Sequence, residues 1–67
     1  MTNEYYVIVD LYNLTYMKNG ESASMNEADK FKTIEGAKEE LKDYDEDFRG
    51  AIYKVKEYKS IKLEKVE

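Results

Sequence analysis

The fold is decided by the stretch Thr33-Ile-Glu-Gly-Ala-Lys-Glu-Glu-Leu-Lys-Asp-Tyr-Asp-Glu-Asp-Phe48, which is the one segment with a helical pattern. Its nonpolar residues recur at steps of three and four, which places them on one side of an α-helix. Thr33 is a candidate N-cap, because its hydroxyl can accept a hydrogen bond from an unpaired N–H of the first turn. Gly36 either is tolerated, at a cost of up to about 1 kcal/mol, or marks the close approach of another backbone or a ligand. The nonpolar side consists of Ile34, Ala37, Leu41, Tyr44 and Phe48.

Acidic residues crowd the C-terminal end of this helix, where the helix dipole favours cations. They are Asp43, Asp45, Glu46 and Asp47. Two interpretations follow from this placement. Either the helix ends near residues 42–44 and the acids lie in a solvated loop, or the acids are kept because a positively charged partner binds them.

The segment before the helix reads as strand. Residues 5–17 are rich in β-branched and aromatic side chains, which predicts a long first strand. The nonpolar face changes sides near Tyr12 and Asn13. This change indicates a bulge or a strong twist, or else a strand that is covered on both faces, the second by a partner subunit.

A tight turn follows at Asn19-Gly20, because these two residues supply the positive φ values of a type I′ hairpin turn. We expect a short second strand near residues 22–26. After the helix, residues 51–58 and 60–66 both alternate between nonpolar and charged side chains, as half-exposed strands do. They form either one long bent strand or two strands. Their lysines are typical of an edge strand.

The predicted element order is therefore β-β-α-β, with the last strand either whole or split in two. Such an order indicates an α+β fold, in which a small antiparallel β-sheet carries one α-helix packed on one face. The 67 residues form a single domain, 1–67. A chain this short buries a small fraction of its surface, so small scaffolds commonly rely on disulfides, metals or self-association.

The composition excludes several kinds of chemistry. The chain has no Cys and no His, which removes disulfides, thiolate metal sites, the commonest zinc ligand and the commonest general base. Of these supports only self-association remains, which favours a homodimer; the alternative is a well-packed small core without a partner. No nonpolar run approaches the ~20 residues of a membrane span, and the N-terminus lacks the basic and nonpolar regions of a signal peptide. We expect a soluble, cytoplasmic protein with no membrane contact.

The net charge of −4 is unevenly distributed along the chain. Residues 21–48 carry ten acids against four lysines, whereas residues 49–67 carry six basic residues against three acids. The acidic middle and the basic C-terminal part can complement each other within the chain or between subunits. Such an asymmetry can also mark a docking face.

Two motif-like segments fail on inspection. The acidic run from Asp43 resembles the start of an EF-hand loop, but Phe48 stands where glycine is required and Lys54 where the last glutamate belongs. Residues 49–56 begin like an RNA-binding strand but lack two of its aromatic positions. No phosphate loop, nucleophile elbow or defined catalytic carboxylate pair is present. We expect neither an enzyme nor a protein with a cofactor or a metal site.

The leading hypothesis is a small protein-binding module that occludes a surface of a larger protein. Seven tyrosines support it, because tyrosine is enriched in protein interfaces. In composition the chain resembles small accessory proteins of bacteriophages and prophages, which are short, acidic, cysteine-free and rich in Lys, Glu, Tyr and Asn. That resemblance implies an inhibitor of a host protein, acting through an acidic, tyrosine-rich face that mimics nucleic-acid phosphates before a basic groove. The candidate contact residues are Glu39, Glu40, Asp43, Tyr44, Asp45, Glu46 and Asp47.

Two other hypotheses remain open. One is a structural homo-oligomer, built by pairing sheets or edge strands across a two-fold axis without a separate target. The other is a nucleic-acid binder, which the four neighbouring acids disfavour because they repel phosphate. It would use the C-terminal lysines Lys54, Lys56, Lys59, Lys62 and Lys65.

Overall fold

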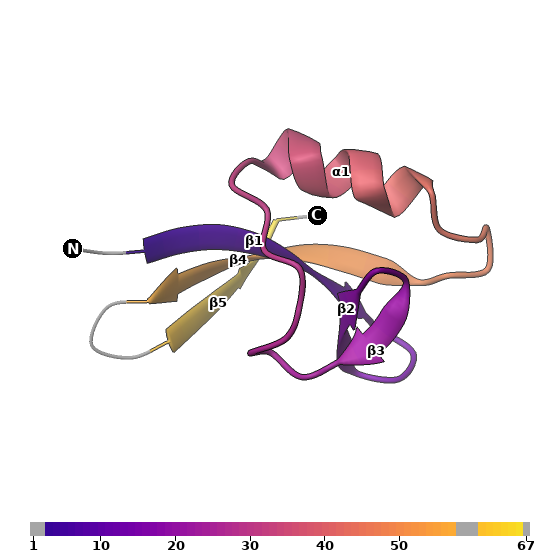
Figure 1. Cartoon of the computed structure of the whole chain (residues 1–67), viewed down its shortest axis with the longest axis horizontal. Helices are drawn as coiled ribbons and strands as arrows, with labels where there is room; N and C mark the ends of the chain where they lie inside the picture. The colour runs from indigo at the N-terminus through magenta and orange to yellow at the C-terminus, as the bar shows by residue number, and fades with distance from the viewer. Residues whose placement is uncertain (1–2, 58–60, 67) are drawn as a thin grey trace.

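A computed structural model describes residues 3–57 and 61–66 of the protein. Five antiparallel strands form one sheet, in the order β3-β2-β1-β4-β5, and one helix lies across one face of it (Figure 1). The predicted α+β fold is therefore confirmed. Its elements are β1 (Asn3–Asp10), β2 (Thr15–Lys18), β3 (Glu21–Ala23), α1 (Ile34–Lys42), β4 (Gly50–Glu57) and β5 (Ile61–Lys65).

Strand β1 lies at the centre of the sheet. It pairs with β4 along its whole length, from Asp10 opposite Gly50 to the other end of the strand, and Ile8 lies opposite Ile52. On its other side it pairs with β2 only near its C-terminal end, where Val9 faces Tyr16. Strand β1 from the N-terminal part of the chain and strand β4 from the C-terminal part thus lie side by side in the middle of the sheet.

The predicted long first strand is wrong, because a turn divides it into β1 and β2. Strand β1 ends at Asp10, whose carboxylate accepts hydrogen bonds from the backbone N–H groups of Tyr12 (2.9 Å) and Asn13 (3.2 Å). The Leu14 N–H donates to the Asp10 carbonyl at 2.8 Å, which closes the turn. The change of nonpolar face near Tyr12 therefore reflects a reversal of the chain rather than a bulge.

The Asn-Gly turn is confirmed. Asn19 has φ 50° and Gly20 has φ 82°, the two positive values that a type I′ turn requires. They join β2 to β3, with Lys18 opposite Glu21. Strand β3 is shorter than the predicted segment and ends at Ala23.

The segment after the helix forms two strands, which answers the question that the sequence left open. Strands β4 and β5 pair antiparallel, with Val55 opposite Leu63. Their connection, residues 58–60, lies outside the described residues. Strand β5 is at the edge of the sheet, but β4 lies between β1 and β5, so the edge assignment holds only for the second of the two segments.

Helix α1 begins as predicted and ends where the first of the two interpretations places its end, near residues 42–44. The Gly36 N–H donates to the Thr33 hydroxyl at 3.1 Å, which makes Thr33 the N-cap. The helix ends at Lys42, with Asp43 as its C-cap. A Cβ atom added at Gly36 would come nearest to side-chain atoms of Thr33, at 3.3 Å, and of Phe31, at 3.8 Å. This surrounding of flexible side chains fits the first interpretation of Gly36, a tolerated glycine.

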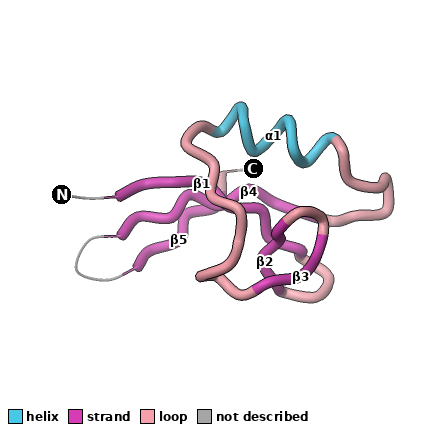
Figure 2. The backbone as a smooth tube through the Cα atoms, viewed as in Figure 1, coloured by secondary structure: helices cyan, strands magenta, loops and turns pink. Residues whose placement is uncertain are grey.

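The two faces of the sheet are covered by different parts of the chain. Ile8 and Ile52 are fully buried on the face that carries α1, where Ala37 of the helix is also buried. On the opposite face Val7 and Val55 pack against Ala28, from the connection between β3 and α1. Figure 2 shows this connection crossing the sheet before it reaches the helix.

The same connection also pairs at one point with the edge of β1 that β2 leaves free. Tyr6 and Phe31 exchange backbone hydrogen bonds of 2.8 and 2.9 Å as an isolated antiparallel bridge. Within the described residues, no helix has the length and nonpolar character needed to cross a membrane.

Candidate functional site

The acidic cluster lies where α1 gives way to a loop. Because the helix ends at Lys42, the acids from Asp43 onward face solvent in the connection to β4. This geometry follows the first of the two sequence interpretations, in which the helix stops before the acids. It leaves four carboxylates within five successive residues at one end of the molecule.

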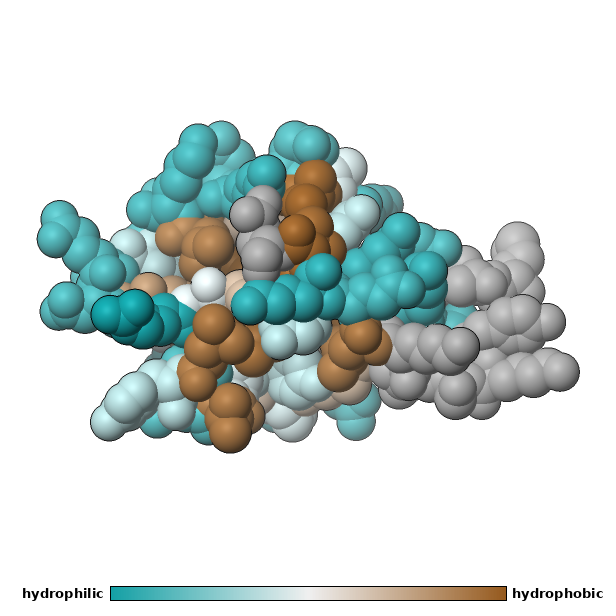
Figure 3. Space-filling view, turned by 180° about the vertical axis from the view of Figure 1, so that it is seen from behind, coloured by the Kyte–Doolittle hydropathy of each residue, from teal (hydrophilic) through white to brown (hydrophobic). Residues whose placement is uncertain are grey.

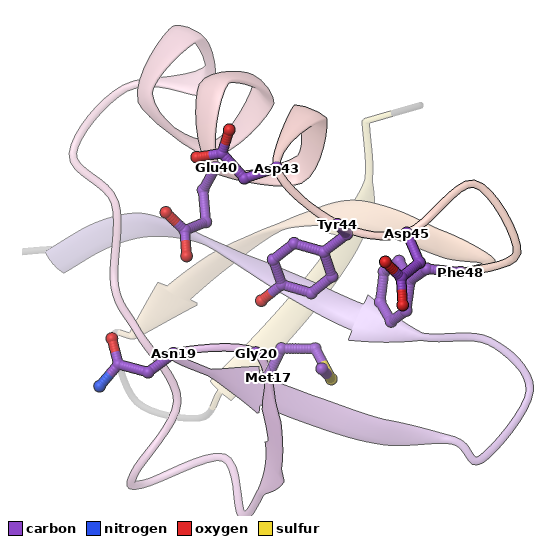
Figure 4. A pocket seen from close by; sticks show the side chains of 8 residues that line it. All are labelled: Met17, Asn19, Gly20, Glu40, Asp43, Tyr44, Asp45 and Phe48. Atoms are coloured by element: carbon purple, nitrogen blue, oxygen red, sulfur yellow. The ribbon is translucent and has the colours of Figure 1, made fainter.

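A pocket of about 370 Å³ lies between this end of the helix and the β2–β3 turn. Four of the seven candidate contact residues line it, and the turn and β2 supply the opposite wall. In Figure 4 the Glu40 side chain and the Tyr44 hydroxyl point toward the Asn19–Gly20 turn. The lining residues are Met17, Asn19, Gly20, Glu40, Asp43, Tyr44, Asp45 and Phe48.

The Tyr44 hydroxyl stays protonated in this surrounding. Burial raises its pKa above the ordinary value of 10.0, and the Glu40 carboxylate raises it further. A backbone hydrogen bond from Gly20 acts in the opposite direction, and the Asp29 carboxylate adds a smaller rise. The pocket therefore combines a neutral phenol with carboxylates, which is a surface that accepts hydrogen bonds and attracts cations.

The nonpolar wall of the pocket is made by Tyr44 and Phe48. Their ring centroids are 4.6 Å apart, with the planes tilted by 59°. The Phe48 ring lies over Gly50, where an added Cβ would overlap the ring. The absence of a side chain at Gly50 therefore leaves room for the Phe48 ring. A cation that enters the pocket would contact aromatic carbon as well as carboxylate oxygen.

The remaining candidate residues lie outside the pocket. Glu39 is on the solvent side of the helix, where its carboxylate pairs with the Lys42 ammonium at 3.4 Å. Glu46 and Asp47 are exposed in the loop that follows. The structure thus brings together Glu40, Asp43, Tyr44 and Asp45, and it separates the other three.

The lysines of β4 form ion pairs with glutamates of β1 and β5 rather than with the acidic residues 21–48. The Lys54 ammonium lies 2.9 Å from the Glu4 carboxylate, and it lowers the pKa of Glu4 through their hydrogen bond and charge. The Lys56 ammonium lies 3.0 Å from Glu64. The charge complementarity expected between residues 21–48 and the C-terminal part is therefore not what holds these lysines. Lys65 is exposed, Lys59 lies outside the described residues, and the side chain of Lys62 is not described.

The tyrosines do not gather on one face. Tyr5, Tyr16 and Tyr53 pack around Val7 and Val55 on the face opposite the helix, and Tyr44 lines the pocket. Tyr6 is half-buried, and Tyr58 lies outside the described residues. Tyr12 is the one described tyrosine that is largely exposed, at 84%.

Sequence reasoning missed the β2 and turn residues of the pocket, and it missed the β1–β2 turn as a surface feature. Asn19-Gly20 was recognised as a turn, but nothing local says that it faces the helix end. The sequence pattern places Leu11, Tyr12 and Leu14 in a strand, whereas the structure exposes them in a turn. The signal that could have found them was the change of nonpolar face at these residues. In the space-filling view the nonpolar surface is divided into separate patches among hydrophilic side chains (Figure 3).

The described residues contain no group of three or more acidic side chains arranged to hold a metal ion. Comparison with protein-family models, with curated proteins and with solved structures gives no match to this chain.

Proposed function

We propose that the protein is a small, non-enzymatic protein-binding module that docks onto a basic surface of a partner protein and occludes it. The observation that carries the proposal is the pocket at the end of α1, which is lined by Glu40, Asp43 and Asp45 together with the rings of Tyr44 and Phe48. An aromatic ring attracts a cation over its face, and nearby carboxylates add charge-assisted hydrogen bonds. A lysine or arginine of the partner fits this chemistry.

Charge placement supports the same direction of docking. The β4 lysines already pair with Glu4 and Glu64, so their charge is locally compensated. The acids of the 43–47 loop face solvent instead. A field of one sign at one end of a small protein increases the rate of encounter with a partner of opposite sign and orients it. In its finer form the proposal makes the chain a phage-type inhibitor acting in the cytoplasm.

The test is a pull-down of the tagged protein from bacterial lysate, washed at low and at high salt, with mass spectrometry of the retained proteins. We expect one stoichiometric partner whose retention decreases at high salt. The double variant Asp45→Lys/Asp47→Lys should lose that partner.

A matched control carries the same change in net charge at other exposed positions, Glu27→Lys/Glu35→Lys. This control should keep the partner if the position of the acids matters. Equal loss in both double variants would show that bulk charge alone governs retention. Full retention by Asp45→Lys/Asp47→Lys would remove the acidic loop from the interface.

A further inference from the structure

The β1–β2 turn places large nonpolar side chains in solvent. Leu14 is 79% exposed, Tyr12 is 84% exposed and Leu11 is 38% exposed. We call these three residues the apolar tip. Burial of the tip contributes little to the stability of the chain itself, because most of its nonpolar area remains in contact with water.

The backbone of the tip adds a second, independent argument. Leu14 has φ 58°, in the left-handed region where a Cβ atom is strained and where Gly or Asn is preferred. A leucine at this position is therefore unfavourable for the backbone and also leaves its side chain in water. Strained residues of this kind cluster at functional sites, so the observed outlier points to a role outside folding.

The tip is held rigidly by its base. The Asp10 carboxylate accepts three hydrogen bonds from the turn, including one of 2.8 Å from the Asn13 side chain. The Leu11 N–H donates to the carbonyl of Arg49 at 2.8 Å. A backbone that is already held in one conformation before binding loses less entropy on association, so this framework suits a binding element.

The hydrogen bond from the Leu11 N–H to the Arg49 carbonyl also joins the tip to the acidic loop, because Arg49 directly follows residues 43–48. Figure 1 shows the β1–β2 turn and the connection after α1 at the same end of the molecule. A partner that covers the tip therefore docks at the same end of the molecule as the acidic loop. A second copy of the chain would bring two acidic loops together, and an anionic lipid surface would repel them, whereas a protein with basic residues would attract them.

We propose that the apolar tip is the anchor of the interface, and that it enters a nonpolar concave site on the partner protein whose rim carries Lys or Arg. The inference rests on the proposed protein-binding function, and it assigns the nonpolar contact that the acidic surface alone does not supply. Interfaces of this kind commonly combine a buried nonpolar centre with a polar rim.

The experiment uses the partner that the wild-type chain retains from lysate, purified and titrated against three variants of the full chain. Leu14→Asn and Tyr12→Ser remove parts of the tip, and Leu63→Asn removes a leucine that is 44% exposed on β5, away from the tip. Circular dichroism before and after heating establishes that each variant is folded. We expect each tip variant to weaken binding by at least ~10-fold, as interface anchors do, and Leu63→Asn to leave it unchanged.

A photo-cross-linking residue placed at position 12 identifies what the tip touches. A cross-link to a nonpolar site of the partner, with Lys or Arg beside it, supports the inference. If the tip variants bind as tightly as wild type while Asp45→Lys/Asp47→Lys does not bind, the inference is overturned and the proposed function stands. If the wild-type chain retains no protein, both are overturned.

Two further measurements test the other occupants. Wild-type protein that forms a dimer by analytical ultracentrifugation, with Leu14→Asn monomeric, would overturn the inference in favour of a second copy. Sedimentation with phosphatidylcholine–phosphatidylglycerol vesicles that Leu14→Asn abolishes would overturn it in favour of a lipid surface.

Discussion

Replacing Leu14 by asparagine should stabilise the protein, although it removes a large nonpolar side chain. Leu14 has φ 58° and is 79% exposed. A non-glycine residue in the left-handed region costs roughly 1–2 kcal/mol, and asparagine is among the few residues that relieve part of this cost through local hydrogen bonds. The substitution therefore removes strain from the folded state.

The loss of burial is smaller than this gain. Only about a fifth of the Leu14 surface is buried, and full burial of a leucine is worth roughly 1.5–3 kcal/mol, so the loss is about 0.3–0.6 kcal/mol. The net gain is about 0.5–1 kcal/mol, which for a domain of this size raises the thermal midpoint by roughly 2–8 °C. Thermal and urea denaturation followed by circular dichroism measure both quantities.

Leu14→Ala is the matched control, because it loses the same burial but lacks the side-chain amide through which asparagine relieves part of the strain at positive φ. We expect it to be slightly less stable than wild type. Asparagine and alanine variants with the same midpoint would refute the strain argument. With the binding experiment above, Leu14→Asn should combine higher stability with weaker binding, which a purely structural role does not produce.

Two predictions concern titration. Hydrogen bonds from the Asn13 side chain and from the turn lower the pKa of Asp10 below its ordinary value of 3.8. The stability that these bonds contribute is therefore present above pH 3.8 and is lost as the pH falls toward the folded-state pKa. Asp10→Asn should flatten this part of an acid-unfolding curve, and an unchanged curve would contradict the role of Asp10. Burial and the 2.6 Å hydrogen bond to Glu57 raise the pKa of Tyr5 from 10.0 to about 12. Its contribution is therefore complete below pH 10 and is lost as the pH rises from 10 toward 12. Because the pKa of Tyr44 is also raised, the spectrophotometric titration compares Tyr44→Phe with Tyr44→Phe/Tyr5→Phe. The single variant should show a tyrosine that titrates near pH 12, and its persistence in the double variant would assign the shift to another tyrosine.

Local patterns predicted the elements whose cause is local. The helical spacing from Ile34 and the hydroxyl of Thr33 are sufficient to place the start of α1. The pair Asn19-Gly20 is sufficient for the β2–β3 turn, because few other residues adopt both positive φ values. The division between β1 and β2 was missed because the turn contains Leu14, a residue that seldom occupies its conformation.

The candidate site was predicted only in part, for a similar reason. Acids at the helix end are visible in the sequence, which therefore predicts Glu40, Asp43 and Asp45 as contact residues. Their placement opposite Met17 and the β2–β3 turn depends on how the helix crosses the sheet. The residue spacing within the helix or within the β2–β3 hairpin does not determine how the two segments are placed relative to each other.

The sequence by itself determined the α+β class, the start of the helix, the Asn-Gly turn and the uneven charge. Each of these depends on the conformational preferences or charges of residues close together in the chain. The tertiary structure decided that β1 is central, that β4 is interior and that residues 24–30 cover the second face. It also placed the apolar tip beside the acidic loop. These features depend on pairing between β1 and β4, which are separated by about 40 residues of chain, and such pairing is selected by burial of Ile8 and Ile52 together rather than by either segment alone.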